Sequence, residues 1–240
     1  MADVDLSQLS TRFGGSEPLK AYVAVPDGDG PWPGVVMVHE IFGLNDVIRG
    51  HADRLSRAGY LVVAPDLFSI GGMRRCLRAT IKAMAAGEGR PYADIEAARA
   101  WVLASPRCTG SVGVIGICLG GGFALMTAGD GFGVAAAHYG QLPRDLDAAL
   151  TGACPIVASF GGRDRTLRGA AARLEAALDR LGVEHDVKEY PHAGHAFMTP
   201  AEAIPRPVRA LLRVAGFGSE PGAAEDAWRR TERFFRDHLS

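Results

Sequence analysis

Residues 111–126, SVGVIGICLGGGFALM, predict a strand that runs directly into a helix. The first part is a continuous apolar run, which is typical of a strand covered on both faces of a parallel sheet. Gly116 and Gly120 flank Cys118 with the spacing of a sharp strand-to-helix turn that displays a nucleophile. Glycines suit this turn because side chains there would clash, and the start of the helix favours a thiolate. A buried structural cysteine in a glycine-rich turn is the alternative, and this stretch alone fits both interpretations.

Similar apolar runs recur on both sides of this stretch and alternate with helical patterns. The predicted strands cover 21–25, 34–39, 60–65, 112–116, 134–139, 155–160 and, in a more polar segment, 184–190. Between them, apolar residues repeat with helical spacing, as at Ile95, Ala98 and Val102. The alternation predicts an α/β fold with a mostly parallel central sheet and helices on both faces. We expect residues 1–240 to form a single domain.

Two polar side chains that could assist Cys118 follow later strands. Asp164 lies in SFGGRDRTL and His195 in YPHAGHAFM, so the chain order is nucleophile, acid and histidine, as in α/β-hydrolases. His195 is a better candidate than His192, because Gly194 gives its loop the freedom to present the imidazole. His195 would take the Cys118 proton, while Asp164 would orient the imidazole and stabilise the imidazolium. Taken singly, a loop-capping aspartate and an ordinary surface histidine are the alternatives.

The loop after the 34–39 strand, HEIFGLND, supplies a second group of candidates. A loop in this position donates one backbone N–H to an oxyanion hole, and Ile41 is the natural donor. The second donor would be the N–H of Leu119, directly after the nucleophile. Glu40 stands out, because a carboxylate beside a thiolate is repulsive unless it acts as an acid or base. A surface glutamate in a turn is the alternative.

Composition excludes several classes of function. The 240 residues carry a formal net charge of −1, which does not favour nucleic acid or an anionic membrane as a partner. No apolar run reaches the roughly 18 residues of a spanning helix, and the polar start lacks the features of a signal peptide. The four cysteines form no Cys-x-x-Cys pair, which argues against a zinc site. We therefore expect a cytoplasmic protein, monomeric by default, that acts on a small molecule.

The motifs HEIFGLND, GYLVVAPDLF, GICLGG, GGRD and GHAF together resemble the dienelactone hydrolase family of α/β-hydrolases over most of residues 18–240. The resemblance implies a Cys-His-Asp triad at the three positions named above. It also implies that Glu40 contacts the thiol and helps to deprotonate it when substrate binds. In this family the amides of Ile41 and Leu119 would form the oxyanion hole, and neither a metal ion nor an organic cofactor would take part.

The substrate is less well defined by these motifs. Family members that open dienelactones carry two arginines for the substrate carboxylate, and one of these lies at the position of Thr199. The stretch MRRCLRAT supplies Arg74, Arg75 and Arg78 as candidates for the other, although a solvated helix face is the alternative. The candidate substrate contacts are Arg75, Phe42 and Tyr139, with packing as the alternative role for Tyr139.

A proline-containing segment, 198–222, separates the last predicted strand from the last helix. Its prolines prevent one continuous helix, although PVRALLRVAG within it could form a short one. We expect this segment to lie on the face of the molecule that carries the site.

Three functions are compatible with these patterns. The favoured one is a cysteine hydrolase that opens a lactone or cleaves a small carboxylic ester. A general carboxylesterase or thioesterase on the same fold is the second, and preference for acyclic substrates would distinguish it. A non-catalytic binding protein is the third, because fold alone does not establish activity.

Overall fold

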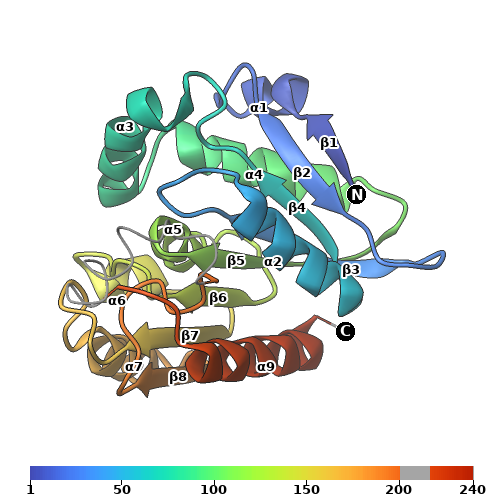
Figure 1. Ribbon diagram of the computed structural model, residues 1–240. Coiled ribbons are helices and arrows are strands. Elements are labelled where there is room, and N and C mark those ends of the chain that lie inside the picture. The colour runs from blue at the N-terminus through green and yellow to red at the C-terminus, as the bar shows by residue number, and fades with distance from the viewer. Residues whose placement is uncertain (201–216, 240) are drawn as a thin grey trace.

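A single eight-stranded sheet forms the centre of the computed structural model, which describes residues 1–200 and 217–239 (Figure 1). The strands are β1 (Ala2–Asp5), β2 (Lys20–Ala24), β3 (Trp32–Val38), β4 (Leu61–Pro65), β5 (Cys108–Ile117), β6 (Ala135–His138), β7 (Ile156–Gly161) and β8 (His185–Tyr190). Their order in the sheet is β1-β2-β4-β3-β5-β6-β7-β8. Strands β3 to β8 are parallel to one another, whereas β1 and β2 pair antiparallel at one edge.

Helices cover both faces of this sheet, as the alternating pattern predicted. The helices are α1 (Ser7–Arg12), α2 (Asp46–Arg57), α3 (Gly72–Ala86), α4 (Arg90–Leu103), α5 (Leu119–Met126), α6 (Leu146–Leu150), α7 (Ala170–Leu181) and α9 (Pro221–His238). In Figure 1, α2 and α9 lie in front of the sheet, while α4 and α5 lie behind it. The predicted mostly parallel sheet between helices is therefore confirmed.

All seven predicted strands are present. The structure differs from the prediction in the start of β5 and in the additional strand β1. β5 begins earlier than its apolar core, because Cys108 pairs with Trp32 of β3. β1 has no counterpart among the predicted strands. It has the polar sequence ADVD and is mostly exposed at the sheet edge, so it lacks the apolar run on which the other assignments rest.

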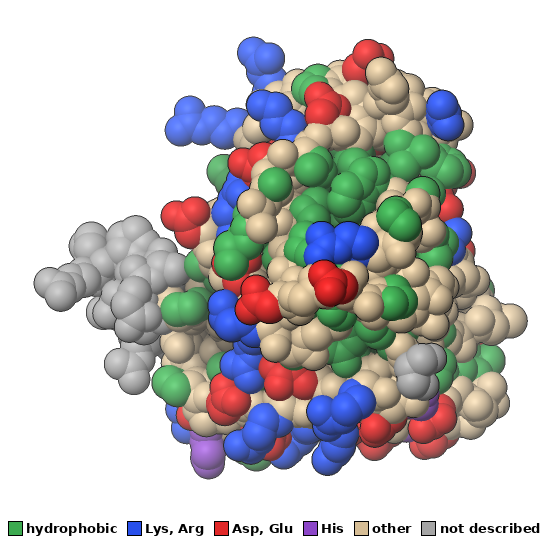
Figure 2. Space-filling model, turned by 90° about the vertical axis from the view of Figure 1, so that its right-hand side faces the viewer, with side chains coloured by type: hydrophobic (Ala, Val, Ile, Leu, Met, Phe, Trp, Pro, Cys, Tyr) green, Lys and Arg blue, Asp and Glu red, His purple; other side chains and the backbone are tan. Residues whose placement is uncertain are grey.

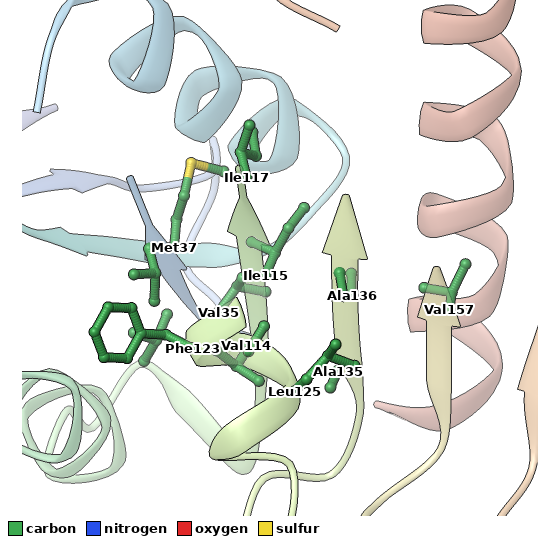
Figure 3. Close-up of a cluster of buried hydrophobic side chains, with 14 of the residues drawn as sticks. Val35, Met37, Val114, Ile115, Ile117, Phe123, Leu125, Ala135, Ala136 and Val157 are labelled. Carbon is green, nitrogen blue, oxygen red and sulfur yellow. The ribbon is translucent and has the colours of Figure 1, made fainter. Parts of the chain in front are cut away.

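The core lies where β3, β5 and β6 meet α5. Figure 3 shows Val35 and Met37 of β3, Val114 and Ile115 of β5 and Phe123 of α5 as members of one buried cluster. All five side chains are fully buried. This packing attaches the helix that follows Cys118 firmly to the central strands, which stabilises the turn between them.

The segment before β2 is attached to α4 through one buried carboxylate. Asp94 accepts hydrogen bonds from the Ser10 hydroxyl at 2.8 Å and from both the amide and the hydroxyl of Ser16 at 2.6 Å. Arg90, one turn earlier on α4, lies 3.3 Å from the same carboxylate. A buried charge held by this many donors explains how a polar N-terminal segment can pack against the core.

Charged residues are mixed on the surface. Figure 2 shows acidic and basic side chains interspersed, most clearly on the lower part of the face that it presents. The ion pairs of Arg54 with Glu225 and Glu232 join α2 to α9 in this manner. Within the residues that the structure describes, no helix is long and apolar enough to cross a membrane.

Candidate active site

Cys118 occupies a strained turn between β5 and α5. Its backbone has φ 55° and ψ −114°, a region that L-residues other than glycine rarely adopt. A side chain on Gly116 would overlap the carbonyl of Gly120, and one on Gly120 would overlap the carbonyl of Val38. The two glycines are therefore required because backbone from the turn and from β3 passes within contact distance of their Cα atoms.

The structure brings Cys118, His195 and Asp164 together in one hydrogen-bonded array. The Nε2 atom of His195 lies 3.1 Å from the Sγ of Cys118, and its Nδ1 lies 2.6 Å from Oδ2 of Asp164. The other carboxylate oxygen accepts hydrogen bonds from the amide and the hydroxyl of Thr166, at 2.8 and 2.6 Å. Asp164 therefore fixes the Nδ1–H tautomer, which leaves Nε2 to exchange a proton with the thiol.

The hydrogen bonds of this array shift the pKa values of His195 and Asp164 in the directions that favour their charged forms. Burial alone would lower the pKa of His195, but its hydrogen bonds to Asp164 and Cys118 outweigh burial and raise the pKa to about 9. Burial alone would raise the pKa of Asp164, but the hydrogen bonds from His195 and Thr166 outweigh that effect, and the pKa is lowered. An imidazolium at neutral pH is therefore favoured beside the sulfur.

We predict that the imidazole of His195 titrates near pH 9, and that Asp164→Asn lowers this midpoint. The stability that protonated His195 contributes is complete below its unfolded pKa of about 6.5 and is lost as pH rises through its folded value. NMR titration of the imidazole signals in the wild type and the variant measures both midpoints. An unshifted midpoint in Asp164→Asn would contradict the assignment.

The backbone N–H groups of the two predicted oxyanion-hole donors have no partner in the described part of the chain. Leu119 is the first residue of α5, and Ile41 lies in the turn after β3; neither amide donates to another described residue. The buried ring of His39 accepts a hydrogen bond from the Leu67 amide at Nε2 and thus donates from Nδ1 to the Glu40 carbonyl, at 2.7 Å. Because a trans peptide directs its C=O and N–H to opposite sides, this bond points the Ile41 N–H away from His39.

Only 3% of the surface of Glu40 is exposed, so this residue is not the surface glutamate that the sequence left as an alternative. Burial raises its pKa, while a hydrogen bond from Asn45 at 3.4 Å and the charge of His195 oppose that rise. Among the described residues no hydrogen bond joins Glu40 to Cys118. The carboxyl therefore lies within electrostatic range of His195 and makes no hydrogen bond to the thiol among the described residues.

Aromatic rings enclose the imidazole of His195. Tyr139 packs edge-to-face against it with ring centroids 5.1 Å apart, and Phe217 lies 5.0 Å away on a separate segment. The His195 carbonyl also accepts a hydrogen bond from the Gly218 amide at 2.9 Å. The described end of the 198–222 segment thus contacts the site, as predicted, whereas the helix predicted at PVRALLRVAG lies outside the described residues.

The residues predicted to contact the substrate differ from one another in how exposed they are. Phe42 is 63% exposed in the turn that also carries Ile41. Arg75 is exposed on α3, where its side chain covers Gly71, and it makes no hydrogen bond or ion pair with the array among the described residues. Tyr139 is fully buried, so its ring serves as packing.

Among the described residues, no group of three or more His, Cys, Asp or Glu side chains lies close enough together to bind a metal ion.

Three residues of this site carry no role in the sequence prediction. Thr166 could have been found, because Asp-x-Thr in a loop is a common pattern in which the aspartate accepts from the backbone two residues ahead. His39 adjoins Glu40 in the sequence, yet its partner Leu67 comes from the loop after another strand. Phe217 gives no local signal, because only tertiary contact places it beside His195.

The sheet order and the strained strand-to-helix turn at Cys118 define an α/β-hydrolase fold. Two solved structures have the same fold. The dienelactone hydrolase of Anabaena variabilis is 22% identical to this chain, with a TM-score of 0.73. A dienelactone hydrolase-like promiscuous phosphotriesterase from metagenomic libraries is 21% identical, with a TM-score of 0.80. Each comparison covers 100% of this chain and 98% of the other. At these identities the likeness shows the fold alone.

Comparison of the sequence with known families identifies the family as well as the fold. A model of the dienelactone hydrolase family matches residues 19–239, so the chain belongs to that family of hydrolases. Curated relatives named "Putative carboxymethylenebutenolidase" include one from Methylorubrum extorquens, 29% identical over 92% of this chain and 77% of the relative. Another, from Escherichia coli strain K12, is 28% identical over 92% of this chain and 83% of the relative.

Proposed function

We propose that this protein hydrolyses a lactone or a small carboxylic ester through a thioester on Cys118. The observation that carries the proposal is the continuous array from Sγ through the imidazole to Asp164, at 3.1 and 2.6 Å. Both distances are those of hydrogen bonds along which a proton can move. Membership of the dienelactone hydrolase family supports the same reaction class, and the names of its curated relatives support a lactone as substrate.

In the first step, the sulfur of Cys118 attacks the substrate carbonyl carbon and forms a C–S bond. The carbonyl electrons move to oxygen, and the amides of Ile41 and Leu119 are the donors available to that oxyanion. Collapse of this intermediate breaks the C–O bond, and the protonated His195 transfers its proton to the departing alkoxide. With a lactone, the alcohol that forms remains attached to the acyl group.

In the second step, water attacks the thioester and gives its proton to neutral His195. The C–S bond breaks, the product leaves as a carboxylic acid, and the sulfur regains its place beside the imidazolium. Asp164 keeps the imidazole oriented in both steps and stabilises its positive charge. Glu40, buried close to this charge, would assist deprotonation of the thiol by stabilising the imidazolium that receives the proton.

Trapping the acyl group tests this proposal. We expect brief incubation with an activated phenyl ester, followed by acid quenching and peptide mass spectrometry, to show one acyl group on the peptide that contains Cys118. Water completes the reaction, so the adduct should be absent after long incubation. Acylation of several cysteines at equal rates, or of none during turnover, would contradict a thioester intermediate.

A further inference from the structure

A chain of hydrogen bonds connects the start of α4 with the turn after β3. The guanidinium Nη1 of Arg90 donates to the Leu67 carbonyl at 3.2 Å. The Leu67 amide donates in turn to Nε2 of His39 at 3.0 Å, and Nδ1 of His39 donates to the Glu40 carbonyl at 2.7 Å. The peptide that contains this carbonyl also carries the Ile41 N–H, so the chain of bonds ends at a predicted oxyanion-hole donor.

The backbone of Leu67 depends on these two side chains for its hydrogen bonds. Leu67 lies in the turn after β4 and is fully buried, as His39 is. A buried amide and a buried carbonyl both need partners. Among the described residues, only the ring of His39 and the guanidinium of Arg90 supply them. Because both bonds act on one residue, a shift of its backbone caused by loss of one bond would also displace the other.

A buried carboxylate holds Arg90 in place. Arg90 is the first residue of α4, where a positive charge opposes the helix dipole. Asp94, fully buried one turn later, compensates with an ion pair of 3.3 Å, and the Ser16 hydroxyl accepts a further hydrogen bond from the same guanidinium nitrogen. These partners fix Nη1 against the Leu67 carbonyl in spite of the unfavourable position on the helix.

We propose that Arg90 is a positioning residue, which holds the Ile41 amide in the direction of the oxyanion hole. It acts through Leu67 and His39, and it makes no hydrogen bond to Cys118 among the described residues. The inference rests on the proposed function, because Ile41 serves catalysis only if an oxyanion forms on the substrate. Donors stabilise an oxyanion best when their direction is fixed in advance, so a loosened Leu67 backbone should slow acylation.

Two reactions of Cys118 separate this role from a general effect on the site. Attack on an activated phenyl ester generates an oxyanion, whereas alkylation by iodoacetamide forms an S–C bond as iodide leaves and generates none. In Arg90→Met we expect kcat/KM for the ester to fall about tenfold or more, while the alkylation rate of Cys118 stays within about twofold of the wild type. Arg90→Lys retains a cationic donor at this position and should recover most of the ester turnover.

Ser10→Ala is the matched control. The Ser10 hydroxyl is also buried and donates to the same carboxylate of Asp94, at 2.8 Å, but it has no bond with Arg90. Its removal should lower the Tm and leave the ratio of ester turnover to alkylation unchanged. Equal loss of both reactions in Arg90→Met, wild-type ester turnover in that variant, or the same fall of the ratio in Ser10→Ala would overturn the inference. Alkylation of the wild type without any ester turnover would instead reject the proposed function.

Amide hydrogen exchange, followed by NMR, tests the same linkage without a substrate. The Leu67 amide should be protected in the wild type by its bond to His39 and should exchange about tenfold faster in Arg90→Met. Ser10→Ala and Arg90→Lys should retain the protection. Equal protection of Leu67 in the wild type and in Arg90→Met would show that Arg90 does not hold this part of the backbone. That result would overturn the inference whether or not the protein turns over esters.

Discussion

Replacement of Cys118 by alanine is expected to lower kcat/KM for an activated ester by about 10⁴-fold or more. The change removes the atom that would form the covalent bond, and water in the site cannot replace it at the same position. The fold should be retained, because alanine fits the turn as well as cysteine does and the thiol makes its only hydrogen bond among the described residues with His195. Steady-state kinetics on a phenyl ester, with circular dichroism to verify folding, provide the measurement.

Cys108 provides a control for this experiment. It is also a free cysteine of intermediate exposure, but it lies at the opposite end of β5, where the strand begins. Cys108→Ala should retain ester turnover within about twofold, as expected of a substitution outside the site. Comparable activity in Cys118→Ala and the wild type would show that the sulfur takes no part, and the proposed mechanism would have to be abandoned.

Gly120→Ala is expected to destabilise the protein by about 3 kcal/mol and to abolish turnover, although alanine is the better helix former. The added Cβ would overlap the carbonyl of Val38, which is backbone of the central strand β3 and cannot rotate away. The turn would have to open, which would move Cys118 relative to His195. Urea unfolding and ester kinetics on the same preparation measure the two effects.

Gly50→Ala isolates the steric part of that effect. Gly50 is also a helical glycine, on α2, but a Cβ there would meet nothing within 4 Å. We expect this variant to be more stable than the wild type by about 1 kcal/mol, with unchanged turnover. If both alanine variants were stabilised alike, the close approach of β3 to the turn could not be the reason for the glycine at position 120.

The proposed roles divide the site into residues that react and residues that hold them. Cys118 and His195 would exchange the proton, while Asp164 and Thr166 fix the imidazole through a chain of hydrogen bonds. His39 has a comparable holding role, because its hydrogen bond to the Glu40 carbonyl sets the direction of the Ile41 amide. Small displacements of such supporting groups have large effects on rate, since transition-state stabilisation depends on preorganised geometry.

The sequence alone allowed the strands, the tight turn at Cys118 and the proximity of Cys118, His195 and Asp164 to be predicted. Parallel strands buried on both faces are continuous apolar runs, and a turn too tight for side chains requires Gly116 and Gly120. The array followed from the fold, because carboxyl ends of neighbouring parallel strands meet at one edge. These features are local in sequence or follow from topology, so a single chain displays them.

Only the tertiary structure decided how the site is supported and what lines it. The bond between His39 and Leu67, and the contact of Phe217 with His195, join segments that no local pattern relates. Burial of Glu40 depends on every neighbour of its side chain at once. Periodicity and spacing report how a segment contacts the core, but whether a buried polar atom has a partner is determined only when all segments are packed together.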